Sequence, residues 1–344
     1  MRFFKFLLKS LVLFLALLGI ATIVLRVIFP PSKLRQLVQD KIRQQIHREA
    51  EIGPVQISPF GLTLGQLRLS DIPDFSKGTF LTVDKLRLRW ALLPLLTMDT
   101  AHRSFTLQTP QVAMLHTAEG KELAVTLTGV QLTLSNFNAT QSQGNFLIAQ
   151  IHNPVYTGTD LSVEWVLKNV DPSFAYLNGW LHVKQGKGQL DNISQWTSGS
   201  PGTKLVLLPV QMLQNIDRLG FINLGLPDFS HLAIKDIVGE YDFKDGKMAI
   251  KNFVIQCPDL SIQTHGLVEL STGALALEVE LQSPRKTLLG EMNLKMQISG
   301  TLAHPVTHLD SLKKKVFKAT LKQFLRSPEN VGETVDNTLK NIFK

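Results

Sequence analysis

Apolar residues fall on every second position through three long segments between Leu260 and Leu302. These alternating apolar positions are Leu260, Ile262, Val268, Leu270, Leu275, Leu277, Val279, Leu281, Met292, Leu294, Met296 and Ile298. The residues between them are mostly polar, and a period of two places the two sets on opposite faces of a strand. The pattern therefore predicts a broad sheet with one apolar face. Such a face is either half of a sandwich core or the lining of an apolar trough.

The same period is found in much of the chain after Val55. Leu62, Leu64, Leu67 and Leu69 alternate with a one-residue slip, and Leu86, Leu88 and Trp90 alternate with two arginines. Further strands are predicted at residues 105–107, 111–115, 123–134, 146–151, 161–167, 237–243 and 248–255. Asp245-Gly246 predicts a hairpin turn between the last two. The stretch 178–202 is rich in Gly, Ser and Asn and predicts loops or weak strands, with a turn at Gly186-Lys187-Gly188.

The N-terminal segment predicts a membrane anchor. An uncharged run begins at Ser10 and continues past a single Arg26 to Pro31, which gives about 20 residues, near the length that spans hydrocarbon. A cleaved signal peptide is the alternative, with Gly19-Ile20-Ala21 as its cleavage site, but the run continues well beyond that point. Residues 1–30 are therefore predicted to be one transmembrane helix. Basic residues flank both of its ends, so charge does not settle its orientation.

Other stretches have helical spacing. Leu34, Leu37, Val38, Ile42 and Ile46 predict a helix, capped by Ser32, that packs across one end of the sheet rather than lying in a membrane interface. A helical interruption is predicted near 204–219, and two amphipathic helices are predicted over 307–344. The two helices over 307–344 either cover the edge of the last strand or contact a membrane surface. The candidates for membrane contact are Lys313, Lys314, Lys315, Lys318 and Lys322.

Composition narrows the class of partner. The chain of 344 residues has a formal net charge of +8, but only 19% of its residues are charged and much of the basic excess lies near the two ends. The middle is close to balance, which argues against a nucleic-acid partner. The basic ends flank apolar segments, which favours anionic lipid headgroups as partners. Cys257 is the only cysteine, so an intramolecular disulfide framework and a Cys-rich zinc site are excluded.

No catalytic constellation is evident in the sequence. His304 and His308 have the spacing of a helical metal pair, but Pro305 disfavours the helix that this pair would need. There is no Gly-x-Ser-x-Gly, Walker loop or His-Glu-x-x-His motif. Glu278 and Glu280 lie on the polar side of a predicted strand, where carboxylates usually face solvent. The chain is predicted to have no catalytic residue, metal or cofactor, and a hydrolase is the least favoured alternative.

An ordered set of short motifs resembles a known family. The N-terminal members are 51–55 (EIGPV), 58–62 (SPFGL), 67–71 (LRLSD), 80–88 (FLTVDKLRL) and 92–96 (LLPLL). The C-terminal members are 239–243 (GEYDF), 266–270 (GLVEL) and 298–302 (ISGTL), followed by His304-Pro305-Val306. Placed after an N-terminal anchor, this set resembles the AsmA-like family of bacterial envelope proteins. The resemblance covers roughly residues 1–100 and 230–306.

The resemblance implies an inner-membrane anchor with a periplasmic body. It implies an AsmA-like helix and β region over 31–200, and a second β region over 201–306. Family members are similar to bridge-like lipid transfer proteins, whose strands form a long curved sheet with an apolar groove. The expected partners are then the membrane and a phospholipid or other acyl-chain lipid, and the expected role is support of outer-membrane biogenesis and integrity. The twelve alternating residues become candidates for lining the groove. A structural or assembly scaffold for outer-membrane proteins or another envelope complex is the alternative.

Overall fold

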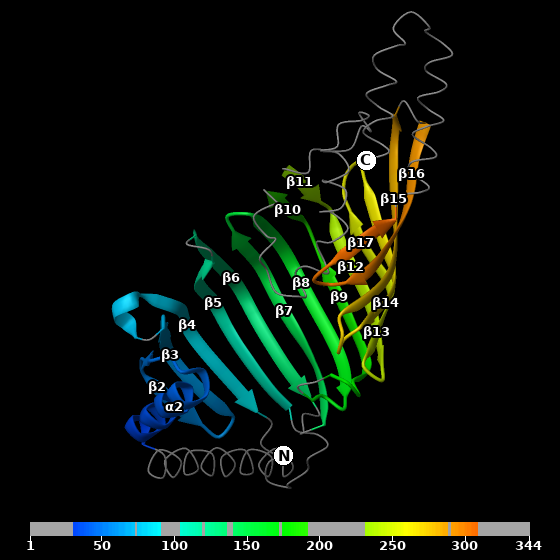
Figure 1. Ribbon diagram of the computed structural model, residues 1–344. Coiled ribbons are helices and arrows are strands. Elements are labelled where there is room, and N and C mark those ends of the chain that lie inside the picture. Colours follow the sequence, from blue (N-terminus) through cyan, green and yellow to red (C-terminus); the bar gives the residue numbers. More distant parts are fainter. Residues whose placement is uncertain are drawn as a thin grey trace, which may run out of the picture. The chain divides into compact units, whose positions relative to one another are not determined.

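The computed structural model describes residues 30–72, 74–90, 104–118, 121–135, 140–171, 174–191, 231–287 and 290–308. Within these ranges, seventeen strands form a long antiparallel sheet, accompanied by helix α2 (Pro31–Ile46) and the 3-10 turn η1 (Phe75–Lys77) (Figure 1). The prediction of a mostly β fold with antiparallel strands is confirmed. In the described ranges, no helix has the length and apolarity needed to cross a membrane.

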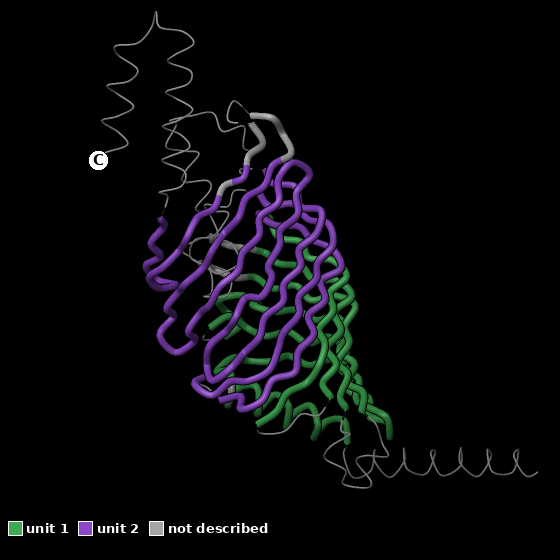
Figure 2. Tube along the Cα trace, turned by 90° about the vertical axis from the view of Figure 1, so that its right-hand side faces the viewer, with its two compact units in different colours: residues 1–154 green, residues 155–344 purple. Residues whose placement is uncertain are grey.

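Several predicted segments lie outside the described residues. They are the anchor up to residue 29, the helical interruption at 204–219 and residues 309–344 of the C-terminal helices. The chain divides into two compact units, residues 1–154 and 155–344, which are coloured separately in Figure 2. The predicted domain boundary at 200/201 also falls outside the described residues, so it stays a prediction.

The first unit is an antiparallel meander. Its strands are β1 (Ala50–Ile52), β2 (Val55–Ser58), β3 (Gly61–Ser70), β4 (Thr79–Trp90), β5 (Ser104–Ala118), β6 (Lys121–Ser135) and β7 (Gln141–Asn153). Strands β1 and β2 both pair with β3 in one continuous register, interrupted only at Gly53-Pro54. From β3 onward each strand pairs with the next one along the chain. Neighbours in sequence are thus neighbours in the sheet, which is the simplest way to build one from hairpins.

The one-residue slip in the sequence corresponds to a change of pleat, a point where the alternation between the two faces of a strand shifts by one residue. This change recurs in several strands of the first unit. Two consecutive residues are both exposed at Asp84-Lys85 in β4, at Pro110-Gln111 in β5 and at Ala149-Gln150 in β7. In β6 the break lies at Gly129, which has a φ of 61°. Because strict alternation would turn the apolar residues to the opposite face after each break, the extra residue keeps them on one face. Strand β5 therefore runs unbroken through Pro110, and the prediction of two separate strands there is wrong.

Helix α2 packs over the β1–β3 end of the first unit. Leu34 and Val38 contact a buried cluster formed by Ile52, Val55 and Leu64. This confirms the prediction that the helix covers one end of the sheet. The helix begins at Pro31, with Pro30 at the N-cap and no side-chain cap hydrogen bond, so the predicted capping by Ser32 is wrong.

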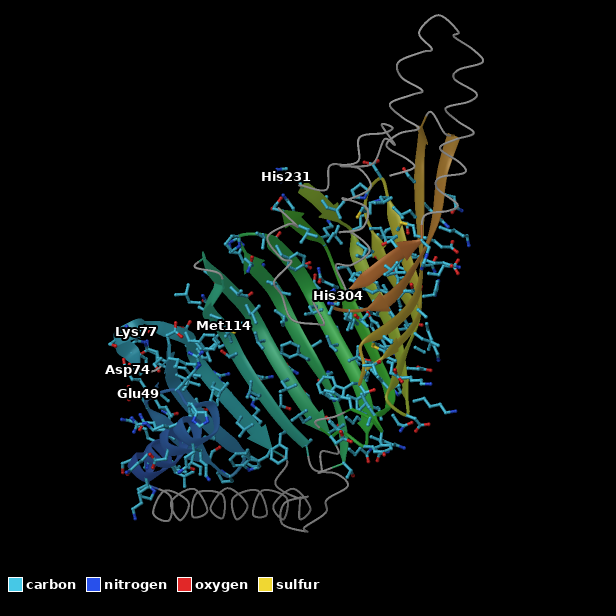
Figure 3. All side chains as sticks on the ribbon, viewed as in Figure 1. Glu49, Asp74, Lys77, Met114, His231 and His304 are labelled. Atoms are coloured by element: carbon cyan, nitrogen blue, oxygen red, sulfur yellow. The ribbon has the colours of Figure 1, made fainter. Side chains whose placement is uncertain are left out.

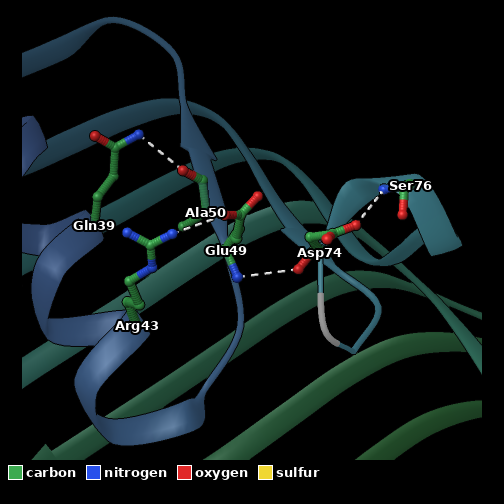
Figure 4. Close-up of polar contacts among 7 residues, drawn as sticks. Gln39, Arg43, Glu49, Ala50, Asp74 and Ser76 are labelled. Atoms are coloured by element: carbon green, nitrogen blue, oxygen red, sulfur yellow. Dashed lines mark hydrogen bonds and ion pairs between the residues drawn. The ribbon is translucent and has the colours of Figure 1, made fainter.

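Polar contacts hold the same helix to β1 and the segment that leads into it. The Gln39 side chain donates a hydrogen bond of 2.8 Å to the Ala50 carbonyl, and Arg43 forms an ion pair of 2.8 Å with Glu49 (Figure 4). At η1, the Asp74 carboxylate accepts a hydrogen bond from the Ser76 amide at 2.8 Å. The Ser76 side chain and then this amide lower the pKa of Asp74. The hydrogen bond from Gln39 is partly buried, whereas the Arg43–Glu49 pair is exposed and adds little stability.

The second unit is also antiparallel. Its strands are β8 (Tyr156–Lys168), β9 (Asn178–Gln185), β10 (Gly188–Asp191), β11 (His231–Ile234), β12 (Asp236–Lys244), β13 (Lys247–Gln256), β14 (Ser261–Glu269), β15 (Ala274–Thr287), β16 (Gly290–Thr301) and β17 (Pro305–His308). Strands β9 and β10 pair with β8 in the same register, so Gly186-Lys187-Gly188 interrupts a strand and does not turn the chain. Residues 178–185 and 188–191 are therefore strands, which is the second of the two alternatives, loops or weak strands, that the sequence predicts there.

From β12 to β17 each strand pairs with its successor. Asp245 and Gly246 both have positive φ, 49° and 72°, which is typical of the two-residue turn predicted there. The last strand, β17, reaches His308, so the chain is still extended at 307–308, where the sequence predicts the start of a helix.

Candidate functional site

The predicted groove residues form the buried core of the second unit. Leu260, Ile262, Val268, Leu275, Leu277, Val279, Leu281, Met296 and Ile298 are between 0% and 6% exposed and belong to one cluster. Leu270 is partly buried and packs against this cluster. The side chains of Met292 and Leu294 lie outside the described residues. The alternation thus identified one continuous apolar face, as the period of two requires.

The register explains how this face is assembled. Leu277 is the cross-strand partner of Ile298, and Val279 that of Met296, so their side chains share a face. Ile262 and Leu281 are likewise partners between β14 and β15. Ile262, Val279 and Leu281 are each 0% exposed, which leaves them no surface for a ligand in this structure. Burial of each such side chain stabilises the fold by about 1.5–3 kcal/mol.

Polar groups within this core are few and chemically inert. Burial raises the pKa of the Tyr241 phenol to about 12, and burial raises that of the Cys257 thiol to about 11. The Ser283 hydroxyl donates to the Asp259 carbonyl at 2.9 Å. The Thr264 hydroxyl is 2% exposed and has no hydrogen-bond partner among the described residues. Because Cys257 stays protonated near neutral pH, it is not a nucleophile.

A second apolar face, which the sequence analysis did not select, lies on the first unit. Consecutive cross-strand partners place apolar residues of β4, β5, β6 and β7 in rows across the sheet. One row consists of Leu88, Leu107, Leu132 and Phe146. Another consists of Val83, Val112, Leu127 and Ile151. Beside the second row, Leu81, Met114 and Val125 form a shorter one, with Met114 on β5 (Figure 3).

The two faces differ in how well they are sealed. In the two four-residue rows of the first unit, Val83 is 4% exposed and the other residues are only half-buried. The buried cluster of the first unit, under α2, has only three members, Ile52, Val55 and Leu64. The core of the second unit, in contrast, takes residues from strands β10 to β16. A half-buried apolar face keeps surface that another apolar group can cover. We name the two four-residue rows, with Leu81, Met114 and Val125, the open face.

The signal for the open face was present in the sequence. Alternation is evident in the sequence at 123–134 and at Leu86–Trp90, but the change of pleat divides the pattern of β5 into two short segments. The alternation within one strand also does not show which residues of the neighbouring strand lie opposite. The sequence therefore predicted the individual strands better than the surface that they form together.

The charged candidates do not assemble into a catalytic or metal site. His308 lies in β17, where its Nε2 is 2.9 Å from the Ser299 hydroxyl, so it forms no helical pair with His304. In the part of the chain that the structure describes, no group of three or more His, Cys, Asp or Glu residues could hold a metal ion. Glu278 and Glu280 pair with Lys295 on the polar side of the sheet. The hydrogen bond that Lys295 donates to the Glu280 carboxylate is the main cause of the raised pKa of Lys295. The five C-terminal lysines lie outside the described residues.

These features define a β-sheet protein with extended apolar faces. The AsmA family model matches residues 1–153, and these residues are an AsmA family domain. The match ends one residue before the first compact unit does. It confirms the N-terminal part of the resemblance and implies a protein of the bacterial envelope, in a non-catalytic family. The resemblance over 230–306 lies outside the matched range and stays a prediction. Searches of curated proteins and of solved structures found no match to this chain.

Proposed function

We propose that this chain is an inner-membrane-anchored periplasmic protein that handles phospholipid along an apolar β-surface, without bond chemistry, and so supports outer-membrane integrity. The observation that carries the proposal is the open face. It presents rows of half-buried leucine, valine and phenylalanine side chains on four successive strands of the family-matched unit. Membership of an envelope family supports the location, and the predicted anchor supports attachment to the inner membrane.

An acyl chain fits the chemistry of the open face. Each methylene that moves from water onto an apolar surface contributes about 0.8 kcal/mol, and no directional contact is required. Neighbouring strands are about 4.8 Å apart, so a row across four strands presents apolar contacts over roughly 14 Å. Because the rows contain no charged residue, a chain could shift along them without breaking an ion pair. Transfer by sliding therefore needs continuity of this surface and no catalytic group.

The test is mass spectrometry of phospholipid bound to the full chain purified in maltoside detergent. Leu107→Asp and Leu132→Asp place a charge in one row of the open face. We expect each to reduce bound phospholipid about tenfold, because lost contact with two methylenes costs about 1.6 kcal/mol. Thr106→Asp and Thr133→Asp are matched controls, since they add the same charge to the polar side of the same strands and should retain lipid.

Thermal melting of all four variants separates loss of lipid from loss of fold. Leu277→Asp is a poor test, because that side chain is 4% exposed in the core of the second unit and a buried charge would unfold it. Wild-type protein that carries no phospholipid, or Leu107→Asp and Leu132→Asp variants that keep it, would contradict the proposal. Crosslinking from position 107 that captures envelope proteins and never lipid would favour the scaffold function in its place.

A further inference from the structure

The polar side of the open-face strands carries a pocket that the proposed function does not use. It has a volume of about 320 Å³. Its lining residues are Lys85 and Arg87 from β4, Gln108, Thr109 and Pro110 from β5, and Gly129, Val130 and Gln131 from β6. Arg87 is the cross-strand partner of Gln108, and Gln108 is that of Gln131, so these three side chains form one row on three adjacent strands.

The pleat change creates the pocket. Two positions along β5 and β6 from this row, where long side chains would otherwise stand, the lining residues are Pro110 and Gly129. Gly129 has a φ of 61°, and a Cβ there would come within 2.7 Å of the Ala149 Cβ. A side chain at position 129 is therefore both strained and obstructed. The absence of side-chain bulk leaves a hollow beside the row, with Lys85 at its rim.

Four of the eight residues that line the pocket carry side-chain N–H donors, and none of the eight is a carboxylate. Lys85 and Arg87 are exposed, and neither side chain makes a hydrogen bond or ion pair with any described residue. The Gln108 amide donates to Gln131 Oε1 at 3.0 Å, which leaves the Gln131 NH₂ group available as a donor. Asp84 precedes Lys85 but does not line the pocket. Two cations without partners beside an amide donor are complementary to a compact anion with several oxygens.

We propose that this pocket binds a phosphate group. Arg87 supplies a planar fork that matches two phosphate oxygens, Lys85 supplies a mobile point charge, and Gln131 supplies a neutral hydrogen bond. The phosphate belongs either to a lipid headgroup or to a soluble phosphate. The site is on the opposite side of the strands from the open face, so each proposal can be tested without affecting the other.

The test is isothermal titration of the full chain in maltoside micelles with inorganic phosphate. Arg87→Gln and Lys85→Gln should each weaken binding about tenfold, as expected for the loss of one charge-assisted contact. Arg89→Gln is the matched control, because Arg89 is an exposed cation on the same side of β4 but does not line the pocket. Leu107→Asp should leave phosphate binding unchanged, which separates this site from the open face.

A second arm of the experiment identifies the source of the phosphate. Mixed micelles that contain phosphatidylglycerol are compared with micelles that contain diacylglycerol, which lacks phosphate. Competition by phosphatidylglycerol alone, weakened in Arg87→Gln, supports a headgroup, and binding of inorganic phosphate without such competition supports a soluble phosphate. The proposal is overturned if the wild-type protein shows no saturable phosphate binding, or if Arg89→Gln weakens it as much as Arg87→Gln.

Discussion

Single residues in this chain owe their chemistry to which face of a strand they occupy. Leu267 and Val268 are neighbours in β14, yet Leu267 is 51% exposed and Val268 is 1% exposed. Cys257 illustrates the same effect on a reactive group. Its side chain is 1% exposed within the core of the second unit, and burial raises its pKa from 9.0 to about 11. The lone thiol is therefore a probe of that core and not a functional nucleophile.

We predict that iodoacetamide at pH 8 labels Cys257 only after the second unit unfolds. Labelling across a urea series, followed by mass spectrometry, should track loss of circular dichroism, because the folded state holds the thiol protonated and covered. The raised pKa stabilises the folded state below pH 9 and this contribution is lost as pH rises toward about 11. Wild-type protein should therefore lose more stability than Cys257→Ala between pH 9 and 11. Rapid labelling in the absence of urea would contradict this view of the core.

At the scale of elements, the period of the sequence predicted strands well and predicted breaks within them poorly. Helix α2 and the turn at Asp245-Gly246 follow from local residue types, since they depend on residues adjacent in the chain. The continuity of β5 through Pro110 could not be predicted in this way. Proline lacks an amide donor, and only the break in the neighbouring strand at Gly129 accommodates it. The phosphate pocket depends on the same break, and so it was equally hidden from the sequence.

Helix α2 should be held to the sheet by one side only. Leu34 packs on the cluster of Ile52, Val55 and Leu64, whereas Leu37, one turn away, is 59% exposed. We predict that Leu34→Asp releases the helix, because it places a charge against that cluster, and that Leu37→Asp does not. Limited proteolysis with trypsin should then cut after Lys41 or Arg43 faster in the first variant. Equal cleavage of the two variants would show that polar contacts from Gln39 and Arg43 suffice to hold the helix.

At the scale of the whole molecule, the family match and the compact units agree on one boundary. The match ends at residue 153 and the first unit ends at residue 154. The first unit has a half-buried apolar face and a small buried cluster, whereas the second has an extensive core. The sequence placed the groove in the second unit because its alternation is longest there. Long alternation, however, marks an apolar face without saying whether that face is covered.

This contrast predicts two levels of stability within one chain. Strands β13–β15 of the second unit carry fully buried side chains such as Ile262 and Val279, so their amides should exchange only on unfolding of that unit. Strands β4–β6 of the first unit bury less apolar surface and should exchange at least tenfold faster in hydrogen-exchange mass spectrometry of the full chain. Mixed micelles of maltoside and phosphatidylglycerol should slow amide exchange in β4–β6 and leave exchange in β13–β15 unchanged. The reason is that bound lipid stabilises only the unit that it contacts. Slower exchange in β13–β15 with lipid would instead place the acyl chain in the second unit, among the residues that the alternation first identified.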